Sequence, residues 1–197
     1  MFTGIIEATG EVVAYEDQGT NRTFRCRVPF LDELRVDQSV SHNGVCLTVA
    51  ALHDDTYDVV AVEETLRKTN LGDLRPGHVV NLERSMPANG RLDGHFVQGH
   101  VDATGVCTLA EDREGSWLYD FEFEAHPEHV LVEKGSIAVN GVSLTVFNVS
   151  DRGFRVTIIP YTYEHTTFRT LRPGHRVNLE FDVLGKYVQR LLARTQA

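Results

Sequence analysis

An internal repeat constrains the fold of this chain more than any other feature of its sequence. Asn43–Val49 (NGVCLTV) returns 97 residues later as Asn140–Val146 (NGVSLTV). The same offset carries Leu74–Glu83 onto Leu171–Glu180, with nine identities in ten residues. Shared β-strand composition alone would give scattered matches, whereas these blocks keep their order and spacing. The chain is therefore a tandem duplication of one folding unit.

A third matched block helps to set the boundaries of the two halves. Gly4–Gly10 matches Gly99–Gly105 at an offset of 95, so the halves differ by a slip of two residues. Pro87–Gly90 has the composition of a linker. We predict one domain over residues 1–88, a second over 95–182 and a separate C-terminal segment over 183–197.

Each half has the pattern of a small β-barrel. Short runs of β-branched and aromatic residues alternate in part with polar ones, and Gly, Asp and Asn turns separate them. The clearest runs are Phe24–Val28, Val45–Ala50, Tyr57–Val62, Trp117–Phe123 and Phe154–Ile159. Helical turns are predicted only at Thr65–Leu71 and Tyr163–Leu171, and the Arg-Pro-Gly-His segments predict tight turns. The expected fold class is all-β, with a closed or nearly closed barrel in each half.

The C-terminal segment has a helical pattern without a counterpart in the first half. Its apolar residues recur at a spacing that places them on one helix face: Val183, Leu184, Tyr187, Val188, Leu191 and Leu192. Lys186, Arg190 and Arg194 fall on the opposite face. Such a stripe can cover the barrel of its own chain or be buried against other subunits, and the pattern is equally compatible with both.

Composition excludes several classes of protein. The formal net charge is −9, so an acidic surface disfavours nucleic acid as a general partner. Cys26, Cys46 and Cys107 are widely spaced and form no CxxC motif, which favours reduced thiols in a cytoplasmic protein. The N-terminus lacks the basic region of a signal peptide, and no apolar run approaches the ~20 residues that span a bilayer. We therefore predict no membrane association.

Single motifs carry little functional information. His95 and His100 are five residues apart, which matches no standard zinc spacing, so we predict no metal site. Comparison of the halves is more informative, because Cys46 stands opposite Ser143 and Ile5 stands opposite His100. Two similar but unequal sites would suit two copies of one ligand in different roles. Drift after duplication would leave the same differences without functional meaning.

Five stretches of the sequence resemble riboflavin synthases of the α-chain type: Met1–Glu7, Ser41–Thr48, Glu64–Gly72, Gly94–Asp102 and Asn140–Thr145. The resemblance covers essentially the whole chain and includes both the duplication and the C-terminal helix. It implies two six-stranded Greek-key barrels and a homotrimer held largely by the C-terminal helices. It also makes lumazine synthase a candidate partner.

The reaction that the resemblance implies is the last step of riboflavin biosynthesis. Two molecules of 6,7-dimethyl-8-ribityllumazine exchange a four-carbon unit, giving riboflavin and 5-amino-6-ribitylamino-uracil. The substrate is its own electrophile and, once its 7-methyl group loses a proton, its own nucleophile. Because the resulting anion delocalises into the ring, we expect no cofactor. The protein then has mainly to hold two rings face to face and to stabilise the anion.

The resemblance also implies which residues form the sites. Positions implicated in catalysis correspond to His100, Cys46, Ser39, Ser143, Thr145 and Asp182. Substrate contacts from the first half would be Phe2, Thr3, Gly4, Ile5, Ile6, Cys46, Leu47, Thr48, Val60, Ala61, Val62, Glu63, Glu64 and Thr65. Contacts from the second half would be His100, Lys134, Ser143, Leu144, Thr145, Ile159, Pro160, Tyr161, Thr162, Tyr163 and Glu164. Each productive site would lie between the N-terminal barrel of one subunit and the C-terminal barrel of another.

An alternative function is a non-catalytic protein of the same fold that binds a lumazine or a flavin. Retention of reactive residues in both halves distinguishes the two functions. The chain keeps Ser39, Cys46, His100, Ser143 and Asp182, which favours the enzyme.

Overall fold

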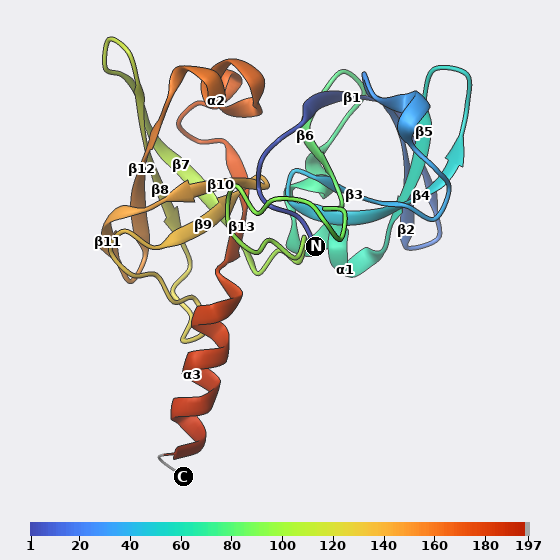
Figure 1. Cartoon of the computed structure of the whole chain (residues 1–197). Helices are drawn as coiled ribbons and strands as arrows, with labels where there is room; N and C mark the ends of the chain where they lie inside the picture. Colours follow the sequence, from blue (N-terminus) through green and yellow to red (C-terminus); the bar gives the residue numbers. More distant parts are fainter. Residues whose placement is uncertain (196–197) are drawn as a thin grey trace.

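The computed structural model describes residues 1–195 and consists of two β-barrels followed by a projecting helix (Figure 1). The first barrel is closed, with strand order β1-β2-β5-β4-β3-β6 and antiparallel pairing throughout. The jump from β2 to β5 gives it a Greek-key connection. Its strands are β1 (Ala8–Gln18), β2 (Asn21–Arg27), β3 (Ser39–His42), β4 (Val45–Leu52), β5 (Tyr57–Ala61) and β6 (Val79–Arg84).

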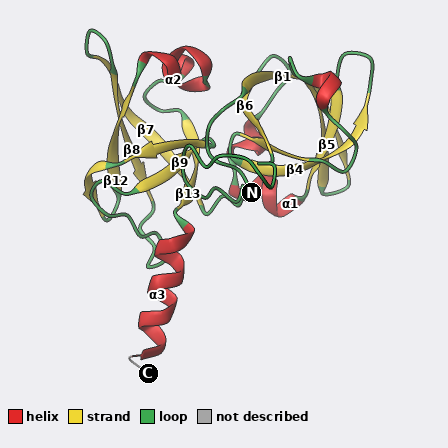
Figure 2. Ribbon diagram, in the orientation of Figure 1, coloured by secondary structure: helices red, strands yellow, loops and turns green. Residues whose placement is uncertain are grey.

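The second barrel repeats this order but is only nearly closed (Figure 2). Its strands are β7 (Ala103–Asp112), β8 (Trp117–Phe123), β9 (Ser136–Val139), β10 (Val142–Thr145), β11 (Phe147–Ser150), β12 (Gly153–Ile158) and β13 (Arg176–Phe181). It has seven strands where six were expected, because the counterpart of β4 is divided at Val146 into β10 and β11. Asn148, at φ +52°, adopts the left-handed conformation inside β11 and interrupts regular pairing there.

Short helices follow the fifth strand of the first barrel and its counterpart in the second. They are α1 (Glu63–Lys68) and α2 (Pro160–His165), each continued by a 3-10 turn, at Asn70–Asp73 and Thr167–Thr170. A further 3-10 turn covers Leu31–Glu33. The predicted helical turns are confirmed, but both begin earlier than expected. In α2, Pro160 stands in the first helical turn, where a backbone N–H would have no partner within the helix.

The Arg-Pro-Gly-His segments form the predicted turns. The N–H of His78 donates to the carbonyl of Arg75 at 3.0 Å, and Gly77 has φ +89°. His175 repeats this contact with Arg172, also at 3.0 Å. Each turn leads directly into the last strand of its barrel, so the turn chemistry sets where β6 and β13 begin.

Each barrel has its own apolar core. The first core contains β-branched residues of the strands together with Phe24 and Tyr57, whose hydroxyl lies 2.7 Å from Nε2 of His42. The second is richer in aromatic rings, including Phe121, Phe154 and Phe168. Two separate cores are what a duplication of one folding unit predicts.

Buried asparagines join the two barrels across a pseudo-twofold axis. The side-chain amide of Asn81 donates to the carbonyl of Asn140 at 2.9 Å, and Asn178 repeats the contact with Asn43 at 2.8 Å. Asn70 adds contacts to the side chains of both Asn140 and Asn178. Because buried amides are costly unless satisfied, this network fixes the relative position of the barrels.

The predicted C-terminal helix is present as α3 (Val183–Thr195), and the last two residues of the predicted segment lie outside the described residues. It points away from both barrels (Figure 1). Its apolar residues Leu184, Tyr187, Val188, Leu191 and Leu192 are 56–68% exposed. The stripe therefore does not cover the barrel of its own chain. None of the described helices is long and apolar enough to cross a membrane.

Candidate active site

Two chain segments run between the barrels and pair with each other. They are residues 1–7, ahead of β1, and residues 95–102, ahead of β7. Phe2 and Val97 exchange backbone hydrogen bonds of 2.7 and 3.1 Å. Both side chains are fully buried in a small cluster with Ala138, against which Cys46 packs. This pairing places the residues that follow, Gly4–Ile6 and Gly99–Val101, at the barrel junction.

Each of these segments then contacts the barrel of the other half. The N–H of Ser143 in β10 donates to the carbonyl of Gly4, and the N–H of Cys46 in β4 donates to that of Gly99, both at 2.8 Å. Ile6 packs against the second core and Val101 against the first. The structure therefore places Gly4–Ile6 with Ser143 of the second half and Gly99–Val101 with Cys46 of the first, whereas the predicted contacts were divided by halves.

Several predicted residues of the first barrel lie on the neighbouring strands β3, β4 and β5. Ser39 pairs with Thr48 in the β3–β4 register, and Cys46 is half-buried beside the Gly99 contact. Val60 and Val62 are exposed at the end of β5, where α1 begins. Some predicted contacts are buried instead: Leu47 and Ala61 in the core of the first barrel, and Phe2, Thr3 and Gly4 at the junction. Glu63 and Glu64 are exposed on α1, and Thr65 is half-buried.

Several predicted residues of the second barrel lie in β10 and around the start of α2. Ile159 and Tyr161, at the start of α2, are 59% and 65% exposed. Together they present a patch of large apolar side chains to solvent. Tyr163 stacks on Trp117 with ring centroids 3.8 Å apart, so one face of its ring is already occupied. The other members are half-buried or exposed: Ile6, Ser143, Leu144, Thr145, Pro160, Thr162 and Glu164, with exposed Ile5 on the segment that crosses from the first half.

Lys134 and Asp182 lie at the margins of the second barrel. Lys134, at φ +66°, has an exposed side chain whose Nζ lies 5.1 Å from the centre of the Phe147 ring. Asp182 accepts a hydrogen bond from the N–H of Leu184 at 3.0 Å and so caps the start of α3. Its charge also acts on the imidazole of His95.

His95 lies against the predicted site residue Ser143 but is not among the residues predicted from the sequence. Its Nδ1 lies 2.7 Å from Oγ of Ser143, and the ring is buried. Burial lowers the pKa of His95, and the nearby Asp182 carboxylate only partly opposes this. A neutral imidazole at this position can exchange a proton with the Ser143 hydroxyl. The contact joins residues that are 48 positions apart, and no local pattern in the sequence indicates it.

The His95–His100 spacing thus supplies a histidine to each barrel. His95 contacts Ser143 of the second barrel, and His100 directly follows the Gly99 contact with Cys46 of the first. Among residues 1–195, no group of three or more His, Cys, Asp or Glu side chains is arranged to hold a metal ion. Each surface therefore combines one histidine, one hydroxyl or thiol, and exposed apolar side chains.

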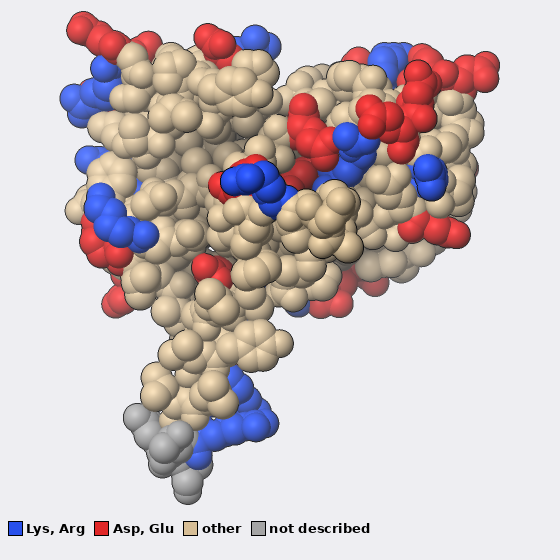
Figure 3. Space-filling view, in the orientation of Figure 1, with Lys and Arg blue, Asp and Glu red and all other residues tan. Residues whose placement is uncertain are grey.

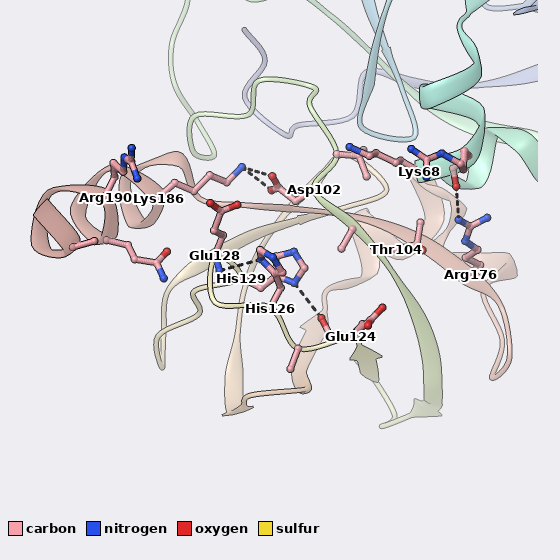
Figure 4. Close-up of a pocket in the computed structure, with 16 residues that line it drawn as sticks. Lys68, Asp102, Thr104, Glu124, His126, Glu128, His129, Arg176, Lys186 and Arg190 are labelled. Atoms are coloured by element: carbon pink, nitrogen blue, oxygen red, sulfur yellow. Dashed lines mark hydrogen bonds and ion pairs between the residues drawn. The ribbon is translucent and has the colours of Figure 1, made fainter. Parts of the chain in front are cut away.

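A cavity lies on another part of the molecule. It has a volume of about 900 Å³ and is lined by residues of α1, β7, the loop after β8, β13 and α3, including Lys68, Glu128, Arg176 and Lys186 (Figure 4). Most of its cations are paired; Lys186, for example, lies 2.6 Å from Asp102. None of the predicted site residues lines it. Two predicted site residues, Thr3 and Ile5, line a separate cavity of about 540 Å³ together with Glu83 of β6.

Comparisons with known proteins give one consistent result. The family model described as "Lumazine binding domain" matches the chain twice, at residues 3–85 and 98–182. The riboflavin synthase of Bacillus amyloliquefaciens is 42% identical over 197 residues, covering 100% of this chain and 92% of that protein. The riboflavin synthase of Mycobacterium bovis is 44% identical over 197 residues, covering 98% of each.

Solved structures show the same fold at lower identity. LumP in complex with riboflavin matches 92% of this chain and 99% of its own, with a TM-score of 0.83 and 22% identity. LumP in complex with 6,7-dimethyl-8-(1'-D-ribityl) lumazine matches 91% and 98%, with a TM-score of 0.82 and 21% identity. At this level of identity the likeness establishes the fold alone.

Proposed function

The chain belongs to the riboflavin synthase family, and we infer that it converts two molecules of 6,7-dimethyl-8-ribityllumazine into riboflavin and 5-amino-6-ribitylamino-uracil. The observation that carries this function is the match to curated riboflavin synthases at 42–44% identity over almost the whole chain. It is a transferase, because a four-carbon unit passes from one substrate molecule to the other. The two substrates contain all the atoms of the two products, so the exchange needs no co-reactant.

We propose that the two surfaces around Cys46 and Ser143 each hold one lumazine. Exposed apolar side chains at equivalent positions, Val62 and Ile159, provide contact for a flat ring. Strand hydroxyls such as Thr48 and Thr145, both exposed, suit the polyol chain. Two copies of one ligand in two related sites is the arrangement that a dismutation requires.

Proton transfer at the 7-methyl group is the step for which the site offers specific residues. Burial keeps the His95 imidazole neutral, and its 2.7 Å contact with Ser143 lets the hydroxyl pass a proton to the ring. His100 provides a second titratable ring at the first barrel. Backbone dipoles of β4 and β10 are fixed before substrate binds and can stabilise the delocalised anion.

We also propose that the protein is a homotrimer in which these sites are completed. The apolar face of α3 is exposed along its length, and Figure 3 shows an uncharged surface there, with Lys and Arg gathered toward the free end. Burying such a face against other copies is the ordinary reason for an exposed stripe of this size. Each productive site would then combine the first barrel of one subunit with the second barrel of another. Co-sedimentation with lumazine synthase tests the further partner that the family resemblance suggests.

One experiment tests the activity directly. The purified protein is incubated with 6,7-dimethyl-8-ribityllumazine, and riboflavin is followed by its absorbance. We expect one riboflavin and one 5-amino-6-ribitylamino-uracil for every two substrates consumed. Tight binding of lumazine without turnover would instead identify a non-catalytic binding protein of the same fold.

A further inference from the structure

Two buried carboxylates occupy equivalent places in the two barrels. Glu83 lies on β6 and Glu180 on β13, and both are almost completely inaccessible to solvent. Glu180 accepts hydrogen bonds from the backbone N–H groups of Gln98 at 2.6 Å, Gly99 at 2.9 Å and His100 at 3.0 Å. Three consecutive N–H groups therefore converge on one carboxylate.

Glu83 makes the corresponding contacts with the N-terminal segment. It accepts from the N–H of Thr3 at 2.6 Å, the hydroxyl of Thr3 at 2.7 Å and the N–H of Gly4 at 2.9 Å. Each carboxylate thus holds the segment that precedes its own barrel. Each segment then passes to the opposite barrel, through the contacts of Gly4 with Ser143 and of Gly99 with Cys46.

We propose that Glu83 and Glu180 are positioning residues that act across the barrel junction. Glu180 of the second barrel fixes the His100 segment at the ligand surface of the first barrel. Glu83 of the first barrel fixes the Ile5 segment at the ligand surface of the second. This inference rests on the proposed function, because it assigns roles relative to the lumazine sites.

The chemistry of the carboxylate supports this role. A carboxylate has two acceptor oxygens and no donor, so it can satisfy three converging donors at once. A glutamine of the same shape would turn its NH2 group toward one of them. Burial raises the pKa of both groups, that of Glu180 to about 7, so each charge is kept at a cost to the folded state. Perturbed buried carboxylates of this kind concentrate at functional sites.

Hydrogen exchange on the full-length protein tests the crossed assignment. The variants are Glu180→Gln and Glu83→Gln, with Glu122→Gln on the exposed side of β8 as the matched control. Exchange is measured by mass spectrometry with and without riboflavin as the probe. We expect Glu180→Gln to speed exchange over 96–102 and to weaken protection by riboflavin over 45–52. Glu83→Gln should do the same over 1–6 and 142–150.

Kinetics and thermal melts on the same samples separate positioning from a structural role. We expect kcat to fall about 10- to 100-fold in both variants, the effect of misplacing a positioning group by about 1 Å. The melting temperature should move by less than about 2 °C, since removing a buried charge offsets the lost hydrogen bond.

Four other outcomes are decisive. Unchanged hydrogen exchange together with unchanged kcat would overturn the proposal. It would also be overturned if riboflavin protected less only in the barrel that carries the substituted residue. A general rise in exchange with a lower melting temperature would make these residues structural only, which also overturns it. If the crossed pattern appears but the wild-type protein makes no riboflavin, the positioning role stands and the proposed function fails.

Discussion

Replacing Gly99 by alanine tests whether the close contact between the barrels governs both folding and the site. Gly99 has φ +80°, a conformation that costs an alanine about 1–2 kcal/mol. A Cβ at this position would also lie 2.6 Å from Cβ of Cys46 and 2.9 Å from the Phe2 ring. Relieving such an overlap costs about 1–3 kcal/mol more. We expect the free energy of unfolding to fall by about 2–5 kcal/mol in total.

Gly77 provides a matched control in the same chain. It has φ +89° in the turn before β6, and an added Cβ would meet no atom within 4 Å. Gly77→Ala therefore carries the backbone cost of about 1–2 kcal/mol without the overlap. Its turnover per folded protein should stay at the wild-type value.

Denaturant unfolding at equal subunit concentration gives both stabilities, and steady-state kinetics gives the activities. The overlap in Gly99→Ala is relieved only if His100 and Cys46 move apart, so we expect kcat to fall by up to about 10²-fold as well. Equal losses of stability in the two variants, or full activity in Gly99→Ala, would refute the argument that the junction is tightly packed and shapes the site.

Four further predictions follow from the same structure. Deleting residues 184–197 should give smaller species by sedimentation and abolish activity, because α3 carries the exposed apolar stripe; an active trimer after truncation would contradict this. Residues 1–88 should fold alone, because they contain a complete closed barrel, and should bind riboflavin in a fluorescence titration without turnover. His100→Gln should lower kcat about 10²-fold with little change in melting temperature, and an unaltered rate would exclude a catalytic role. Burial raises the pKa of Glu180 to about 7 in the folded protein, so its contribution to the free energy of unfolding is present in full below the ordinary glutamate pKa. This contribution is lost as pH rises through about 7. Glu180→Gln should remove this part of the pH dependence of unfolding.

The architecture could be predicted from the sequence because its signals are local or repeated. The offset of 97 residues revealed two equivalent units, and the Arg-Pro-Gly-His turns marked where their last strands begin. The apolar spacing over Val183–Leu192 predicted α3, although only the structure resolved whether it covers its own barrel. The break at Val146 was not predictable, since it depends on the left-handed conformation of Asn148, where the first barrel has Ala51 in its strand.

The contact of each segment with the barrel of the other half could not be predicted by comparing the two halves, for a physical reason. Aligning the halves pairs Gly4 with Gly99 as equivalents, and it implies that each belongs with the rest of its own half. A pseudo-twofold axis between the barrels is equally consistent with segments that contact the opposite barrel. Both segments then cross, and Gly4 remains equivalent to Gly99. The choice between them is made by hydrogen bonds between distant residues, Gly4 with Ser143 and Gly99 with Cys46, that no local pattern encodes.

Under the proposed function, the exchange of segments also gives the differences between the halves a functional meaning. In an assembly of identical units, both ligand surfaces would receive the same segment. Here His100 follows the Gly99 contact with Cys46 of the first barrel, whereas Ile5 follows the Gly4 contact with Ser143 of the second. His95 is the imidazole that contacts Ser143. A reaction in which two identical molecules take unequal roles needs two surfaces that recognise the same ligand but treat it differently. Covalent duplication with crossed segments provides that inequality at the junction while leaving the β-barrel framework the same in both halves.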